Sequence, residues 1–206
     1  MRLFLRLKSL LGFGGRFDPS PAARRLPAAT VREISAVDHE SCIDIYKQNE
    51  SRFFPPDYLQ FFVEELSSDS HLWLGIEEDG QLLAVGGIRE VEEDTAAAAL
   101  SFGMVRPDKQ GMGYGSILLL ARIASLPKSD PNTRIIMSSV EKSSGFHNRY
   151  GFAFVTRIRM QDGIELDHYY ADVSVSAWEA ARTLLPAQAF SFDPNDINVP
   201  RRPLGR

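Results

Sequence analysis

The sequence has little cysteine: Cys42 is the only one in 206 residues. A single thiol excludes an intrachain disulfide, and it excludes metal sites built from paired cysteines. We therefore expect no metal site. The low cysteine content also suits a protein of the reducing cytoplasm, which is the location we expect.

Long apolar runs and a positive net charge are lacking as well. No apolar stretch approaches the ~20 residues that a membrane-spanning helix requires. The formal net charge of -4 argues against a nucleic-acid partner, because phosphate-binding surfaces are basic. Hydrophobic residues at 44% and charged residues at 24% are typical of a globular protein. We predict one folded domain with extensions at both ends.

The two ends of the chain differ in composition from the middle. Residues 1–13 combine leucines on one helical face with Arg2, Arg6 and Lys8, and they contain no acid. Such a stretch either lies on an anionic membrane surface or packs against the protein itself or a second subunit, and both interpretations stay open. Residues 12–29 resemble a linker, and we expect loose order after residue 194. We therefore divide the chain into an N-terminal segment (1–29), a main domain (30–175) and a C-terminal helix and tail (176–206).

Apolar periodicity predicts a mixed α/β domain. Alternating or β-rich runs indicate strands, and apolar residues at helical spacing indicate helices. Asp79-Gly80 between two alternating stretches is typical of a hairpin turn. The expected strands are 30–37, 71–78, 81–90, 96–105, 134–140, 152–159 and 164–173, the last two joined at 161–163, and the expected helices are 38–47, 55–66, 113–126, 143–150 and 177–185.

A glycine-rich turn, Gln110-Gly-Met-Gly-Tyr-Gly-Ser116, separates a predicted strand from an apolar helix. Free backbone amides at a helix N-terminus bind phosphate, and glycines let the phosphate approach closely. A Walker loop is excluded because Ser116 and Ile117 follow Gly115 where that loop needs lysine. The spacing also differs from the dinucleotide-binding GxGxxG motif. The remaining interpretation is a site for the pyrophosphate of coenzyme A.

These residues resemble a known family. The turn is similar to the Gln/Arg-x-x-Gly-x-Gly/Ala signature of the GNAT superfamily of acyl-CoA-dependent N-acyltransferases. A second stretch, Phe146-His147-Asn148-Arg149-Tyr150-Gly151-Phe152, is similar to the later GNAT segment Phe-Tyr-x-x-x-Gly-Phe. The resemblance covers about residues 30–175. It implies an α/β fold of GNAT type, with a mixed, mostly antiparallel central sheet that splays between its fourth and fifth strands and is flanked by helices.

The resemblance also implies where acetyl-CoA binds. The end of the fourth strand is expected to pair with the pantetheine arm, the turn to hold the pyrophosphate, and the second motif to contribute further contacts. The expected cofactor-binding residues are Gly103, Met104, Val105, Gln110, Gly111, Met112, Gly113, Tyr114, Gly115, Ser116, Phe146 and Asn148.

Three residues are candidates for catalysis by the same resemblance. The backbone N–H of Val105 corresponds to the usual oxyanion donor, and His147 stands where the family places a tyrosine that protonates the departing thiolate. An imidazolium could donate that proton, although His147 could equally bind phosphate. The strand at 96–105 lacks the glutamate that often serves as base, and Ser101 is its conspicuous polar side chain. Glu141 and the acids near residue 90 are further alternatives.

The resemblance implies transfer of an acetyl or short acyl group from acyl-CoA to an amine of a small molecule or a protein. A homodimer is a further expectation. Aromatic residues between 53 and 62 fall where the acceptor site is commonly walled, yet aromatics at helical spacing usually belong to a core. Because the strand carboxylate and the tyrosine are replaced, a module that binds acyl-CoA without turnover stays open as an alternative.

Overall fold

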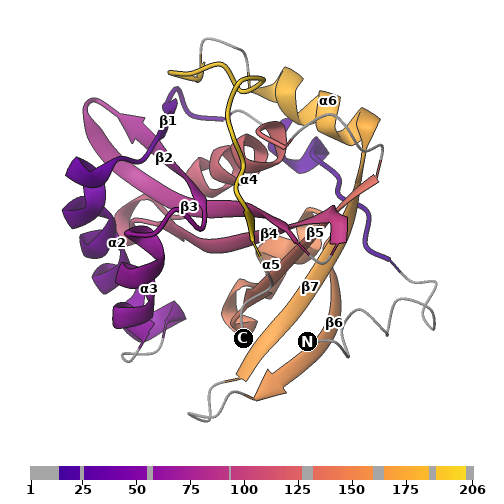
Figure 1. Cartoon of the computed structure of the whole chain (residues 1–206), viewed down its shortest axis with the longest axis horizontal. Coiled ribbons are helices and arrows are strands. Elements are labelled where there is room, and N and C mark those ends of the chain that lie inside the picture. The colour runs from indigo at the N-terminus through magenta and orange to yellow at the C-terminus, as the bar shows by residue number, and fades with distance from the viewer. Residues whose placement is uncertain are drawn as a thin grey trace.

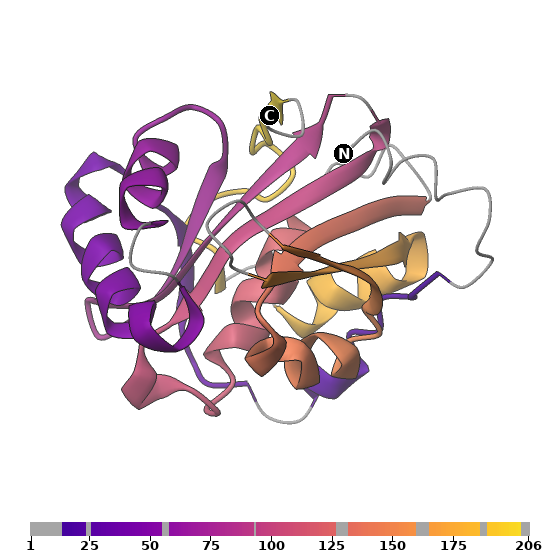
Figure 2. The ribbon, with the colours of Figure 1, turned by 90° about the horizontal axis from the view of Figure 1, so that it is seen from below.

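Figures 1 and 2 show the protein as a computed structural model of the whole chain. The structure describes residues 14–23, 26–54, 58–92, 94–126, 132–159, 165–185 and 189–202. The amphipathic stretch at 1–13, the turn at 161–163 and the prolines at 55 and 56 lie outside these ranges.

The elements follow the predicted α/β order. The strands are β1 (Thr30–Glu33), β2 (Leu72–Glu78), β3 (Gln81–Val91), β4 (Asp94–Val105), β5 (Asn132–Ser139), β6 (Ala153–Arg159), β7 (Glu165–Ser174) and β8 (Arg201–Arg202). The α-helices are α2 (His39–Phe53), α3 (Tyr58–Leu66), α4 (Tyr114–Ala124), α5 (Ser144–Arg149) and α6 (Val175–Leu184). Short 3-10 turns are η2 (Ser20–Ala23), η3 (Ala36–Asp38), η4 (Pro107–Lys109) and η5 (Glu141–Ser143).

In the described residues the strands form one sheet in the order β1-β2-β3-β4-β5-β7-β6, with β8 added to β3. Neighbours along this order are antiparallel except β4 and β5, which run parallel. The β2–β3 hairpin turns at Asp79 (φ 51) and Gly80 (φ 72), the left-handed pair that suits a two-residue hairpin. The predicted mixed, mostly antiparallel sheet flanked by helices is confirmed.

Two apolar cores hold the helices to opposite faces of the sheet (Figures 1 and 2). The larger core contains nearly all of α4, which is apolar around its whole circumference because it is enclosed by the sheet and α6. The smaller core packs Tyr46 of α2 and Phe62 of α3 against Trp73, Val85 and Met104 of the sheet. The start of α4 is thereby fixed beside the end of β4.

The N-terminal extension differs from the linker prediction in its described part. Residues 14–23 run along the domain, where Phe17 is buried and stacks on Tyr150 at 6.3 Å. The N–H of Phe17 donates to Asp172 O, and the N–H of Asp172 donates to Gly15 O. Composition suggested a linker because Gly, Pro and Arg dominate there, but one aromatic side chain anchors the segment.

The C-terminal tail also differs from the expectation of loose order. The N–H of Ser191 donates to Val31 O at 2.9 Å, Val199 is buried, and β8 pairs with the end of β3. The first strand is shorter than predicted because Asp38 accepts hydrogen bonds from Ser35 N–H and from Arg32, which turns the chain into η3. In the described part of the chain, no helix is long and apolar enough to cross a membrane.

Candidate active site

The parallel strands β4 and β5 pair over only part of their length. Their register runs from Ala97 opposite Arg134 to Leu100 opposite Met137. β4 then continues to Val105 and β5 to Ser139 with no pairing between them. The edge of β4 that faces β5 is therefore open from residue 101 onward, as the expected splay requires.

A β-bulge shapes the open part of β4. The register with β3 shifts between Val85 and Gly87, so that Gly86 opposes both Phe102 and Gly103. Phe102 has a φ of 46, in the left-handed region that side-chain-bearing residues rarely occupy. Such strain typically costs ~1–2 kcal/mol and persists where the surroundings enforce it, often at functional sites. The bulge re-aims the residues that follow it on the strand.

Beyond the bulge, the N–H of Val105 points toward the splay. The N–H of Arg106 donates to Leu83 O at 2.9 Å, which makes these two residues a hydrogen-bonded pair of the ladder. Because bonded and non-bonded pairs alternate, Val105 directs its N–H and C=O away from β3. Its C=O accepts from Asn49 Nδ2 at 3.1 Å and from Gln110 Nε2 at 3.2 Å. The N–H of Val105 is therefore free to donate a hydrogen bond to the pantetheine arm or to an oxyanion in the splay.

The glycine turn leads into α4 as predicted. Gly111 (φ 78) and Gly113 (φ 102) adopt left-handed conformations, and Gly113 is the N-cap of the helix. Within the described ranges, the amides of residues 111–115 make no backbone hydrogen bond, so they face outward at the positive end of the helix dipole. A Cβ at Gly111 would meet nothing within 4 Å. Donors and space together fit a pyrophosphate.

The side chain of Gln110 ties the turn to α2 instead of facing outward. Its Nε2 donates to Asn49 Oδ1 at 2.9 Å, and its Oε1 accepts from Arg52 at 3.3 Å. Asn49 is buried and also donates to Ile45 O at 2.8 Å. Of the predicted cofactor residues, Gln110 can therefore contribute backbone contacts, while its side chain positions the end of β4.

Two other residues of the turn are anchored by phenol groups. The buried Tyr114 donates its O–H to Glu78 at 2.8 Å. Ser116 accepts from the O–H of Tyr150 at 2.6 Å, which links α5 to the start of α4. Tyr150 itself is buried. These contacts hold the turn rigid for an incoming ligand.

The remaining predicted cofactor residues vary in exposure. Met112 is 57% exposed, and Gly103 and Asn148 are also exposed. Phe146 is half-buried and lies beside Gly115, where a Cβ would approach its ring at 3.7 Å. Met104 is buried in the core beneath α2, and by the alternation that turns Val105 outward its N–H and C=O face β3 instead of the splay. The structure thus gathers the turn, the second motif and the end of β4 around one opening.

His147 lies on α5 and is half-buried, with its Nδ1 atom shielded from solvent. Its Nε2 lies 3.1 Å from Ser139 Oγ, and that hydroxyl also contacts Ser143, which donates onward to Val140 O. Because Ser143 uses its hydrogen on Val140 O, Ser139 must donate to Ser143. Ser139 Oγ can then only accept from His147, so the imidazole hydrogen lies on Nε2. Burial, with repulsion from Arg122, lowers the pKa of His147 to about 4. A ring with so low a pKa is uncharged at neutral pH, which argues against the imidazolium acid expected from the motif.

A cation lies under the bulge without a carboxylate partner among the described residues. Arg122 of α4 is 6% exposed, and a Cβ at Gly86 or Gly103 would come within 3.0 Å of its guanidinium. It donates to Ser101 O and Gly87 O at 3.5 Å, both long contacts. Burial lowers the pKa of Arg122 to about 10, so the group stays charged at neutral pH. Positive charge is therefore fixed close behind the open edge of β4.

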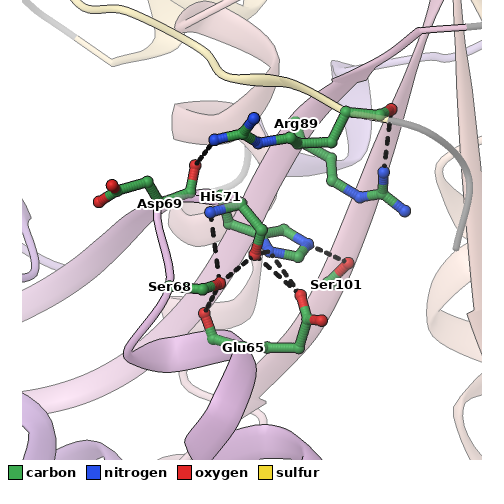
Figure 3. A network of polar contacts seen from close by, with 8 residues as sticks. Glu65, Ser68, Asp69, His71, Arg89 and Ser101 are labelled. Atoms are coloured by element: carbon green, nitrogen blue, oxygen red, sulfur yellow. Dashed lines mark hydrogen bonds and ion pairs between the residues drawn. The ribbon is translucent and has the colours of Figure 1, made fainter.

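Ser101, the first residue past the paired region, joins a polar network that the sequence did not indicate (Figure 3). Its Oγ lies 3.0 Å from Nε2 of His71, and Nδ1 of His71 lies 3.2 Å from Glu65. Ser70 bridges the same histidine and glutamate. Neither Glu65 nor His71 belongs to a sequence motif. The register of β2, β3 and β4 brings His71 next to Ser101, and α3 brings Glu65 next to His71.

The aromatic residues before β2 belong mainly to the core. Phe62 is fully buried and stacks on Tyr46 at 5.1 Å. Phe61 is 47% exposed, and its ring lies 5.9 Å from that of Phe102 at the bulge. One face of this cluster therefore borders the strand end where an acceptor would enter.

Comparisons with known proteins agree with this geometry. The model of the Acetyltransferase (GNAT) family matches residues 35–152. The ribosomal-protein-S18-alanine N-acetyltransferase of Escherichia coli superposes with a TM-score of 0.56 at 20% identity, over 71% of this chain and 94% of that chain. Ard1 of Thermoplasma volcanium gives 0.57 at 17% identity, over 71% and 99%. The aminoglycoside N(6')acetyltransferase of Legionella pneumophila gives 0.59 at 14%, over 78% and 99%.

At these identities the solved structures establish the fold alone, and no curated protein matched the sequence. The family model, however, spans more than half of the chain and includes both the glycine turn and the motif on α5. The chain therefore belongs to the GNAT family of acetyltransferases, a membership that implies acetyl-CoA-dependent acetyl transfer.

Proposed function

We propose that the protein transfers an acetyl or short acyl group from acyl-CoA to an amine of a small molecule or of a protein. The observation that carries this proposal is the juxtaposition at the end of β4. An outward-facing N–H of Val105 adjoins a glycine turn whose amides are free of backbone partners in the described residues. A thioester and a pyrophosphate of one ligand need donors of these two kinds.

The chain's residues take distinct roles in this proposal. The amides of residues 111–115 bind the pyrophosphate, and the open edge of β4 at Gly103 and Val105 pairs with the pantetheine arm. Bound acyl-CoA supplies a thioester, whose C–S bond is exchanged for a C–N bond to the acceptor. The N–H of Val105 stabilises the carbonyl oxygen as charge develops on it, and the buried charge of Arg122 reinforces that field.

In the proposed reaction, His147 is a neutral group beside the splay. Its Nδ1 is buried and has no hydrogen-bond partner among the described residues. With the hydrogen on Nε2, Nδ1 can accept a hydrogen bond but cannot donate one. The departing thiolate then takes its proton from the nitrogen that has just become acylated, and His147 is not required as its acid.

Calorimetric titration with acetyl-CoA, followed by thiol release over a panel of amines and peptides, tests the proposal. We expect binding, and CoA release that depends on one class of amine. Binding without turnover on any acceptor would instead support a module that senses acyl-CoA. That alternative is favoured by the absence of a carboxylate on β4 between residues 96 and 105. An absence of binding would contradict both functions.

A further inference from the structure

Ser101 lies at the start of the splay between β4 and β5. It is the first residue of β4 beyond the last β4–β5 pair, and it directly precedes the bulge at Phe102. Its side chain is half-buried on the face of the sheet that carries α3, while its carbonyl accepts from Arg122 on the other side. The hydroxyl is therefore a polar group at the start of the splay, on the same strand as Val105 and four residues before it.

The hydrogen bonds behind Ser101 run in one direction (Figure 3). Ser68 donates to the backbone carbonyl of Glu65, and Ser70 donates to the Glu65 carboxylate at 2.9 Å. With its hydrogen committed, Ser70 Oγ accepts from Nδ1 of His71 at 2.8 Å. Nε2 of His71 is then the acceptor for the O–H of Ser101 at 3.0 Å. The arrangement is a hydroxyl, a neutral imidazole and a carboxylate in series.

The environment keeps the imidazole uncharged at rest. His71 is 8% exposed, and its ring packs over Gly87, where a Cβ would meet it at 3.0 Å. Burial, with repulsion from Arg89, lowers the pKa of His71 to about 3. Trp73 adds an apolar ring at 5.2 Å, and Arg202 of the tail reaches the carbonyl of Asp69. A proton can pass through such a ring without accumulating on it.

The far end of the series reaches solvent. The side chain of Glu65 is 28% exposed. His71 also lines a hollow of about 650 Å³ between the α3–β2 connection, η3 and the C-terminal tail, which lies away from the glycine turn. Residues 68 and 69 line the same hollow. A proton delivered to Glu65 therefore has a route to bulk water that does not cross the cofactor site.

We propose that Ser101, His71 and Glu65 form a relay that removes a proton from the acceptor amine and delivers it to the partly exposed carboxylate of Glu65. The inference rests on the proposed acyl transfer. Ser101 is the residue that touches the amine, and His71 and Glu65 are positioning residues that act through it. The relay supplies the base that β4 lacks as a side chain of its own.

The step balances without any further reagent. The ammonium form of the acceptor gives a proton to Ser101 Oγ as the hydroxyl proton moves to Nε2 of His71. The proton on Nδ1 of His71 moves to the carboxylate of Glu65, directly or through Ser70. One positive and one negative charge disappear together, and the neutral amine retains the lone pair that forms the new C–N bond. Glu65, whose side chain is partly exposed, then loses its proton to solvent.

A purely structural role explains the network less well. A buried Ser–His pair between strands costs desolvation that an apolar pair would avoid, and Gly87 must lack a side chain to admit the ring. The same serine also begins the splay. A role in proton transfer accounts both for the desolvation cost of the buried Ser–His pair and for the position of Ser101 at the start of the splay.

Three substitutions test the relay: Ser101→Ala, His71→Gln and Glu65→Gln. In steady-state assays with acetyl-CoA and the amine that gives the fastest thiol release, we expect kcat to fall about 10- to 100-fold in each, within the range of general acid–base effects. The dissociation constant for acetyl-CoA should stay within about twofold, since none of the three lies at the turn. Ser125→Ala, which also removes a buried hydroxyl, and Glu64→Gln, on the neighbouring position of α3, are matched controls that should retain full activity.

The pH profile separates proton transfer from structural damage. The deficits should be large at pH 6–7 and should shrink toward pH 9–10, where an amine of ordinary pKa near 10 deprotonates unaided. Deficits that are equal at every pH, or variants as active as the wild type, would overturn the relay. A wild type that binds acetyl-CoA yet acylates no amine would remove the proposed function, and the relay with it.

A nitrogen-15 spectrum of the full chain gives a readout that needs no acceptor. We expect His71 to be neutral at pH 7, with the hydrogen on Nδ1 and the unprotonated nitrogen at Nε2. Ser101→Ala should shift Nε2 and leave Nδ1 little changed. A charged ring, or a hydrogen on Nε2, would contradict the direction of the relay even if the enzyme is active.

Discussion

Replacing Arg122 with methionine should remove a buried charge without destabilising the fold. The lowering of its pKa from 12.5 to about 10 corresponds to about 3 kcal/mol of desolvation at ~1.36 kcal/mol per unit. Because the folded-state pKa is depressed, this penalty is present at neutral pH and disappears only as the pH rises above the unfolded value. Three donated hydrogen bonds of 3.3 to 3.5 Å oppose it. Long contacts of this kind contribute at most ~1 kcal/mol each. We therefore expect Arg122→Met to raise the free energy of unfolding by about 0 to 2 kcal/mol.

Urea unfolding at pH 7 measures this change, and Arg157→Met is the matched control. Arg157 holds the carboxylate of Asp167, which is 5% exposed, by contacts of 2.5 and 3.0 Å. Its removal leaves a buried carboxylate unpaired and should destabilise the protein. We also expect Arg122→Met to lower kcat, since Ser101 O loses its buried donor. If Arg122→Met lost as much stability as Arg157→Met, the desolvation cost of Arg122 could not outweigh its hydrogen bonds, and the prediction would be wrong.

Three further predictions concern the turn, the end of β4 and the start of α2. Gly111→Ala forces a side chain onto a φ of 78 in front of the turn, and calorimetry should show acetyl-CoA binding weakened about tenfold, or ~1.4 kcal/mol. Asn49→Ala leaves Val105 O with one donor fewer, and urea unfolding should show a loss of about 1–3 kcal/mol. Asp38→Asn should cost about 1–2 kcal/mol at pH 7. The Arg32 guanidinium holds the pKa of Asp38 well below its ordinary value, so this difference should begin to shrink as the pH falls below about 4 and should vanish only below the folded-state pKa.

Features that depend on a few consecutive residues could be predicted from the sequence. The turn at residues 110–116 can be recognised in the sequence because its glycines lie between a predicted strand and a predicted apolar helix. The Asp79-Gly80 hairpin is equally local. The family resemblance added the splay, which periodicity alone does not indicate, and the β4–β5 register begins to fail at the expected place.

Features that depend on strand register could not be predicted. Ser101 and His71 are 30 positions apart, and they meet only because both face Gly87 across three strands. The role of His147 depended on burial, which a motif position does not reveal. Residues 14–23 were misjudged for a related reason, since a composition rich in glycine and arginine conceals one buried phenylalanine, Phe17.

We propose that the splay and the glycine turn together bind acyl-CoA for transfer to an amine. Calorimetric titration of the full chain with acetyl-CoA, coupled to an assay of thiol release with and without amines, tests this proposal. We expect one-to-one binding and CoA release that requires an amine. An absence of acetyl-CoA binding would contradict the proposal.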